Sequence, residues 1–153
     1  MELNNFILEE YDSNNYYHKS TVILLENDDE AWKYLGCIED IIAETKNNSL
    51  ENPYDNFYIV YQKGEIEPFG IIIFNFFKTS NIYSISYGIL PKYRGMKLSS
   101  ILLSEFTEYI FEQYQEIEEI SLQINKSNII SMKTASRSGY VKKYGTKYVK
   151  TRN

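Results

Sequence analysis

Three short apolar segments in the middle of the chain constrain its fold more than any other feature. They are rich in β-branched and aromatic side chains, and they cover residues 57–61, 69–77 and 82–90. A tight turn around Gly64 separates the first two, and Asn81 marks the turn before the third. Pro91 ends the third segment because proline offers no N–H to a strand ladder. The pattern therefore predicts three consecutive antiparallel strands.

Helical and strand patterns flank these three strands. Apolar residues at helical spacing predict one helix over about 29–45 and another over about 99–115. Further predicted elements are short strands at 6–8, 21–25 and 120–124, a helix over 128–138 that stops at Gly139, and a terminal hairpin of 141–144 and 147–151 around Gly145. The fold class is α+β, with one sheet covered by helices.

Composition narrows the class of protein. The chain has 153 residues, 43% of them hydrophobic and 24% charged, so we expect one globular domain over residues 1–153. Its single cysteine excludes an intrachain disulfide, and one histidine with that cysteine cannot build a Cys/His zinc site; we expect no metal. No apolar run approaches 18 residues and the first residues are acidic, so we expect a cytoplasmic protein without a membrane partner.

Charge is distributed unevenly along the chain. The net charge is −5, yet residues 126–153 hold eight basic and no acidic side chains. Such a basic end could bind nucleic acid, meet one polyanionic small ligand, or neutralise the acidic body of the protein. The overall negative charge argues against a nucleic-acid partner.

The segment Ile89 to Leu103 carries the clearest chemical signal. It reads as a strand, a turn rich in small and basic residues, and an amphipathic helix. The first turn of a helix has unpaired N–H groups and a partial positive charge, so it can bind phosphate oxygens. Lys92, Arg94 and Lys97 add positive charge there. The same residues would also suit an ordinary basic turn between a strand and a helix.

Two segments together resemble a known family. Residues 91–95, followed by 98–103, resemble the acetyl-CoA-binding signature of the GNAT superfamily of N-acetyltransferases. Residues 128–140 resemble that superfamily's N-x-x-S…K-x-G-F element, closest to the ribosomal-protein N-terminal acetyltransferase branch. The resemblance covers about residues 57–153. It implies a GNAT-like mixed, mostly antiparallel sheet flanked by helices, with a bulged and splayed central strand pair and the bulge near Gly88.

The resemblance also implies where acetyl-CoA binds. The pantetheine arm would pair with the backbone of residues 89–90 and meet two asparagines, and the pyrophosphate would meet the N–H groups of residues 95–100. Lys97 and Ser99 stand where the family pattern R-x-x-G-x-[GA] has small residues, and Asn128 also suits a helix N-cap. The expected cofactor-binding residues are Ile89, Leu90, Arg94, Gly95, Met96, Lys97, Leu98, Ser99, Ser100, Asn125 and Asn128.

The catalytic groups common in the family are less evident. Many members place a tyrosine acid where this chain has Ala135, so the serine of N-x-x-S, Ser131, is the candidate proton donor. Tyr83 and Tyr87 are nearby hydroxyls, but a phenol with a pKa of about 10 is a poor base. The base stays unassigned, with a water relay or a glutamate from residues 26–44 as alternatives.

We therefore expect an N-acetyltransferase that moves an acetyl group from acetyl-CoA to a primary amine by direct attack. The amine could be a peptide N-terminus, a polyamine or a small aminated molecule. The alternative is a non-catalytic acyl-CoA-binding or protein-interaction module on the same fold. A homodimer is left open.

Overall fold

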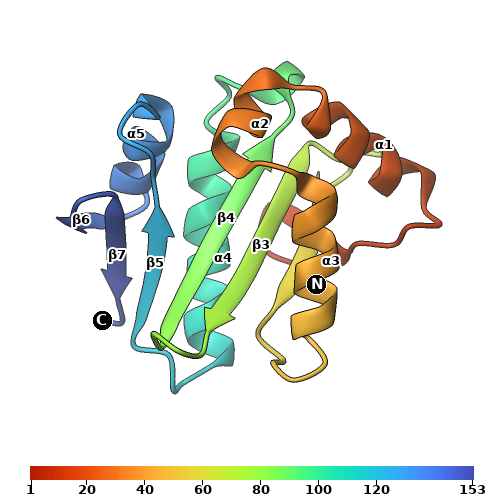
Figure 1. Cartoon of the computed structure of the whole chain (residues 1–153). Coiled ribbons are helices and arrows are strands. Elements are labelled where there is room, and N and C mark those ends of the chain that lie inside the picture. Colours follow the sequence, from red (N-terminus) through yellow and green to blue (C-terminus); the bar gives the residue numbers. More distant parts are fainter.

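A strand buried on both faces forms the centre of the structure, a computed structural model that describes residues 1–153 (Figure 1). This strand, β3 (Gly70–Phe77), directs Ile71 and Ile73 into one hydrophobic core and Ile72 and Phe74 into another. Because side chains alternate along a strand, burial on both faces requires an almost continuous apolar sequence. The apolar run that dominates the sequence is therefore the middle layer of the protein.

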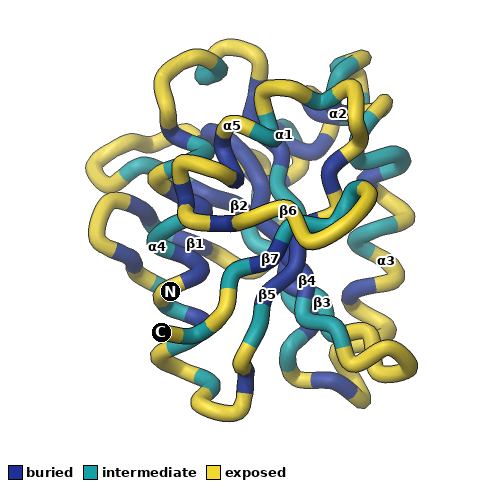
Figure 2. The backbone as a smooth tube through the Cα atoms, turned by 90° about the vertical axis from the view of Figure 1, so that its left-hand side faces the viewer, coloured by how far each residue is buried: buried dark blue, intermediate teal, exposed yellow.

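Seven strands form one sheet in the order β1-β2-β3-β4-β5-β7-β6. Only β4 and β5 are parallel; every other neighbouring pair is antiparallel. The strands are β1 (Phe6–Glu10), β2 (Asn56–Gln62), β3, β4 (Ile82–Ile89), β5 (Glu119–Gln123), β6 (Val141–Tyr144) and β7 (Lys147–Thr151). The predicted run of three antiparallel strands and the terminal hairpin are confirmed, and exposed β6 forms one edge of the sheet (Figure 2).

Helices cover both faces of this sheet (Figure 1). The first face is covered by α1 (Tyr16–Glu26), α2 (Asp29–Leu35) and α3 (Ile38–Asn48). The second is covered by α4 (Leu98–Gln113) and α5 (Ile129–Arg137), with a short 3₁₀ turn (Pro91–Tyr93) between β4 and α4. The structure has no helix that is both long and apolar enough to cross a membrane. The α+β class with a mixed, mostly antiparallel sheet is thus confirmed.

Two predicted elements are wrong. Thr21 to Leu25, predicted as a strand, belongs to α1, which Asn15 caps by accepting hydrogen bonds from the N–H groups of Tyr17 and His18. Its β-branched residues favour a strand locally, but the helix buries Val22 and Leu25 completely beneath the sheet. The helix predicted over 29–45 is two helices, because Gly36 adopts a φ of 80° and ends α2.

The central strand pair, β4 and β5, is splayed as expected, but the expected bulge is missing. Pairing between β4 and β5 is limited to Tyr83↔Ile120 and Ser84↔Ser121. The pairing of β3 with β4, in contrast, continues without a register shift through Ile71↔Gly88 to Gly70↔Ile89. Gly70 permits this close approach, because a Cβ added there would lie 2.3 Å from the carbonyl oxygen of Gly88. The bulge predicted at Gly88 is therefore absent.

Candidate functional site

The separation of β4 from β5 leaves an open strand edge inside the protein. In an antiparallel ladder, alternate residues direct their N–H and C=O groups to opposite sides. The N–H of Leu90 donates to the carbonyl oxygen of Phe69 at 2.9 Å, so the backbone groups of Tyr87 and Ile89 face away from β3. Because β5 pairs with β4 only at Tyr83 and Ser84, these groups face the gap. An extended ligand could pair with them as an added strand would.

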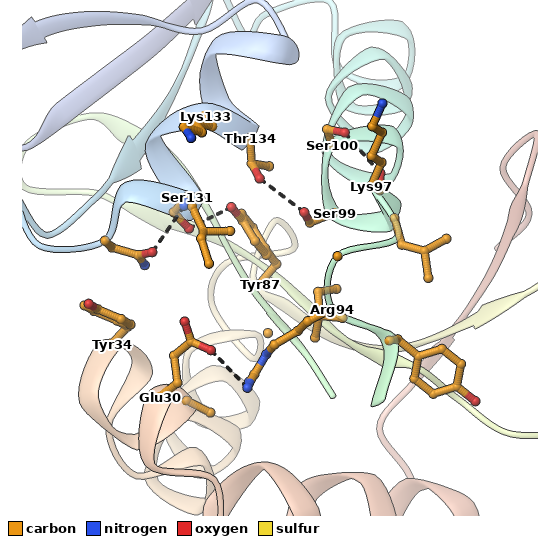
Figure 3. Close-up of a pocket in the computed structure, with 18 of the residues that line it drawn as sticks. Glu30, Tyr34, Tyr87, Arg94, Lys97, Ser99, Ser100, Ser131, Lys133 and Thr134 are labelled. Carbon is orange, nitrogen blue, oxygen red and sulfur yellow. Dashed lines mark hydrogen bonds and ion pairs between the residues drawn. The ribbon is translucent and has the colours of Figure 1, made fainter. Parts of the chain in front are cut away.

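A cavity of about 400 Å³ occupies this gap (Figure 3). Its walls come from α2, from the second half of β4, from the loop that enters α4, from the first turn of α4 and from α5. The lining residues are Glu30, Ala31, Tyr34, Leu35, Tyr87, Gly88, Ile89, Tyr93, Arg94, Gly95, Lys97, Leu98, Ser99, Ser100, Asn128, Ile130, Ser131, Lys133, Thr134 and Arg137. A volume of this size falls in the range of small-molecule and cofactor sites.

The loop before α4 presents an uncapped helix N-terminus to the cavity. Gly95 has a φ of 83° and Lys97 a φ of 61°, so the chain makes two left-handed steps before α4 begins at Leu98. Lys97 occupies the N-cap position but contributes no side-chain cap, and the hydroxyl of Ser100 donates back to the carbonyl oxygen of Lys97 at 3.0 Å. The first N–H groups of α4 are therefore free to bind an anion.

Positive charge surrounds this helix end. Lys97, Lys133 and Arg137 line the cavity, and none of them forms an ion pair within the protein. Arg94 differs, because its guanidinium lies 2.5 Å from Asp28 Oδ2 and 2.9 Å from Glu30 Oε2. Three unpaired cations beside unpaired N–H groups form a site for a polyanion.

Hydroxyl groups from β4, α4 and α5 line the cavity (Figure 3). The Tyr87 hydroxyl lies 2.8 Å from Ser131 Oγ, and the hydroxyls of Ser99 and Thr134 are 3.2 Å apart. Asn128 caps α5, since its side-chain oxygen accepts a hydrogen bond from the Ser131 N–H at 3.2 Å. Burial raises the pKa of Tyr87, although hydrogen bonds with Ser131 and Thr134 act against this rise. The wall can therefore hold and donate protons.

Comparison with known proteins decides the family. The family described as "Acetyltransferase (GNAT) family" matches residues 8–140. The chain belongs to the GNAT acetyltransferase family. None of the curated protein sequences matches it.

Solved GNAT structures share the fold at low sequence identity. A putative ribosomal-protein-serine acetyltransferase from Vibrio cholerae superposes with a TM-score of 0.75 at 16% identity, over 97% of this chain and 95% of that one. A GNAT acetyltransferase from Bacillus anthracis gives 0.72 at 16% identity over the same shares of the two chains. The aminoglycoside acetyltransferase AAC(6')-Ib, in complex with coenzyme A and kanamycin, gives 0.71 at 16% identity, over 96% and 95%.

The cavity suits acetyl-CoA, the acetyl donor of the GNAT family. The uncapped start of α4 and the three unpaired cations beside it, Lys97, Lys133 and Arg137, match a pyrophosphate and a further phosphate. The open edge of β4 at Tyr87 and Ile89 matches an amide-rich pantetheine arm. Apart from Gly95 itself and its two neighbours in the chain, no residue has a heavy atom within 4 Å of a Cβ added at Gly95, so the approach to the helix end is uncrowded.

The structure gathers most of the expected GNAT cofactor residues at this cavity. Those that line it are Ile89, Arg94, Gly95, Lys97, Leu98, Ser99, Ser100 and Asn128, together with the candidate acid Ser131. The Arg94 guanidinium is nevertheless paired with acids of α2.

Three expected residues lie outside the cavity wall. The Leu90 N–H and carbonyl oxygen bond to Phe69 and Tyr93, so its backbone cannot serve a ligand. Met96 is 59% exposed, and the side-chain oxygen of Asn125 accepts hydrogen bonds from the N–H and hydroxyl of Ser127. Local hydrogen bonds thus occupy the Leu90 backbone and the Asn125 side-chain oxygen.

Sequence reasoning missed several cavity residues. Lys133 and Arg137 lie four positions apart and therefore project from the same face of α5, a spacing visible in the basic C-terminal part. Tyr34 comes from α2, where no local pattern pointed to the site; its hydroxyl lies 3.1 Å from Ser127 Oγ. The sequence suggests Tyr87 only as a poor base; its partner Ser131 lies 44 residues further along the chain, and only the fold brings the two hydroxyls together.

Proposed function

We propose that this protein transfers an acetyl group from acetyl-CoA to a primary amine. One observation carries the proposal: an open strand edge leads, within one cavity, to an uncapped helix N-terminus beside unpaired cations. The edge suits the arm of the donor, and the helix end suits its phosphates. When bound, acetyl-CoA supplies an activated acetyl thioester.

Each part of the cavity has a role in this proposal. The N–H groups of Gly95 to Ser100 hold the pyrophosphate, with Lys97, Lys133 and Arg137 as counter-charges. The arm pairs with the backbone of Ile89 and not with that of Leu90, whose polar groups are already bonded. Of the two residues that face the gap, Tyr87 and Ile89, Ile89 lies farther from the point where β4 pairs with β5. Arg94 shapes the loop through its ion pairs with α2 rather than by binding phosphate.

The proton chemistry rests on hydroxyls and water. Glu30 is the only carboxylate on the cavity wall, and it is paired with Arg94. A water relay is therefore the better candidate to remove the proton from the amine, which must be neutral to attack. Ser131 lines the cavity and, with Tyr87, offers hydroxyl protons for the departing thiolate.

The acceptor is proposed as an amine on the strength of the fold relatives. Their names assign acetylation of a ribosomal protein, an aminoglycoside and spermidine. All three acceptors present primary amines, although they differ widely in size. A panel of acceptors should therefore span peptide N-termini, polyamines and aminoglycosides.

Two measurements test the proposal. Calorimetric titration with acetyl-CoA should show saturable binding, and thiol release should follow when one amine of the panel is added. Binding without thiol release for any amine would favour the non-catalytic module. Failure to bind acetyl-CoA would refute both.

A pair of matched variants localises the binding site. Lys133→Gln removes a cation from the cavity wall and should weaken acetyl-CoA binding by about threefold, as expected for a solvent-accessible charge pair. Lys126→Gln removes an exposed cation that does not line the cavity, and the affinity should not change. Equal effects of the two substitutions would place the cofactor elsewhere.

A further inference from the structure

Tyr87 and Ser131 form a hydroxyl pair on the cavity wall that β4 and α5 build. Tyr87 comes from β4 and Ser131 from the first turn of α5, and their oxygens are 2.8 Å apart (Figure 3). Both line the cavity. Ala135, one turn further along α5, is fully buried and has no polar side-chain atom. The phenol on this wall therefore comes from Tyr87 on β4, because the α5 position where many family members have a tyrosine holds Ala135.

Acid strength distinguishes the two hydroxyls. A thiol has a pKa of about 8.5 and a phenol about 10. An aliphatic hydroxyl is about as weak an acid as water, and therefore a much weaker acid than a phenol. Proton transfer is efficient when the pKa values of donor and acceptor are close. A phenol is therefore a far better proton donor to a thiolate than a serine hydroxyl.

The surroundings favour a protonated phenol close to a developing anion. Burial raises the pKa of Tyr87, so the phenol keeps its proton through the neutral range. The charged and titratable groups around it are Glu30 and Tyr34 on α2, Tyr93, Arg94 and Lys97 in the loop, Lys133 and Arg137 on α5, and Tyr140 behind the wall. Glu30 is the only carboxylate among them, and it forms an ion pair with Arg94.

We propose that Tyr87 donates the proton that coenzyme A sulfur takes up, with Ser131 orienting the phenol. The inference rests on the proposed acetyl transfer and deepens it. The bond from the acetyl carbon to the amine nitrogen forms, and the carbon–sulfur bond breaks. Sulfur takes the Tyr87 proton, the amine loses one proton to water, and the Tyr87 oxygen regains a proton from water through the Ser131 hydroxyl. The products are an amide and a thiol.

A binding experiment isolates the contact with sulfur. The probes are coenzyme A and desulfo-coenzyme A, which lacks the sulfur atom, titrated at about pH 7 and about pH 9.5, on either side of the ordinary thiol pKa of about 8.5. The measured quantity is the affinity for coenzyme A divided by the affinity for desulfo-coenzyme A. If Tyr87 donates to the thiolate, this ratio should rise about tenfold from the lower to the higher pH in the wild type, a change called the gain below. In Tyr87→Phe that gain should fall to less than about twofold.

Tyr140→Phe is the matched control. Tyr140 also pairs its hydroxyl with a side-chain hydroxyl, Thr107 Oγ1 at 2.6 Å, but it does not line the cavity. The control should lose stability and keep the tenfold gain. A structural role of Tyr87 alone would leave the gain intact in Tyr87→Phe as well, and that result overturns the inference.

Further outcomes separate this inference from the proposed function. A gain that survives Tyr87→Phe but disappears in Ser131→Ala would make Ser131 the donor and overturn the assignment. If Tyr87→Phe does not fold, Ser131→Ala serves as the second test, and a gain reduced but not abolished supports Tyr87. If the wild type binds neither probe, the proposed function itself fails. Loss of kcat by about a hundredfold with little change in KM should accompany the loss of the gain in Tyr87→Phe.

Discussion

The Asp28 carboxylate holds Arg94 at 2.5 Å, between Oδ2 and Nη2, and so ties the start of α2 to the loop that enters α4. The same oxygen accepts a hydrogen bond from the Ala31 N–H at 3.0 Å and thereby caps α2. The hydrogen bond from Arg94 is the main reason why the pKa of Asp28 is lowered. The Asp28 side chain thus links the N-terminus of α2 to the loop before α4, although Asp28 and Arg94 are 66 residues apart in the sequence.

Replacing Asp28 should destabilise the protein in two separable steps. Asp28→Ala removes both the cap and the ion pair, and should lower the free energy of unfolding by about 2 kcal/mol. Asp28→Asn keeps an oxygen that can cap the helix and should lose less than about 1 kcal/mol. Urea unfolding measures both values. Equal losses in the two variants would show that the cap contributes nothing.

The lowered pKa of Asp28 also predicts a pH dependence. A carboxylate with a lowered pKa contributes stability that is fully present above the ordinary aspartate value of about 3.9, and that is lost as the pH falls through the lower folded value. The difference in unfolding free energy between wild type and Asp28→Asn should therefore shrink between about pH 5 and about pH 2. A difference that stays constant over this range would contradict the coupling to Arg94.

Gly95→Ala should affect both stability and coenzyme A binding. The φ of 83° is unfavourable for any residue with a Cβ, so the unfolding free energy should fall by about 1 kcal/mol. The added methyl also narrows the approach to α4 and should weaken coenzyme A binding by about tenfold, or about 1.4 kcal/mol.

Gly64→Ala is the control for backbone strain. Gly64 has a φ of 85° in the β2–β3 turn, and like Gly95 it has no heavy atom within 4 Å of an added Cβ. Its replacement should lower the unfolding free energy by the same amount and leave coenzyme A binding unchanged. If Gly95→Ala binds coenzyme A with unaltered affinity, the coenzyme A phosphates do not bind at this loop.

Lys97→Gly should make the protein more stable. Lys97 adopts a φ of 61°, a left-handed conformation that suits glycine better than lysine, so the unfolding free energy should rise by about 1 kcal/mol. Lys97→Ala removes the same ammonium group but keeps the strain, and its stability should stay close to that of the wild type. Both variants should bind coenzyme A equally weakly in calorimetry; a difference between them would mean that backbone freedom, not charge, sets the affinity.

Local chemistry explains which elements could be predicted from the sequence. The apolar periodicity of β2 to β4, the turn at Asn81 and the stop at Gly139 all depend on residues close together in the chain, and the structure places them as expected. The same holds for the basic strand–loop–helix segment, whose turn and helix start are encoded locally. The two-segment resemblance added the family, which the family match confirms.

Tertiary packing decided what these local signals could not. The strand tendency of Thr21 to Leu25 yields to a helix because Val22 and Leu25 are buried beneath the sheet. The Leu90 N–H cannot serve a ligand because it donates to the carbonyl oxygen of Phe69. Arg94 forms an ion pair with Asp28, the N-cap residue of α2.

The sequence by itself determined the order of the elements from β2 to β7 and the basic turn that leads into α4, because these follow from neighbouring residues. Only the tertiary structure decided which side chains surround the cavity and which backbone groups stay unpaired. Tyr87 and Ser131 meet only because β4 separates from β5 and leaves α5 beside the open strand. Such long-range pairings depend on the packing of the whole sheet, which no local pattern specifies.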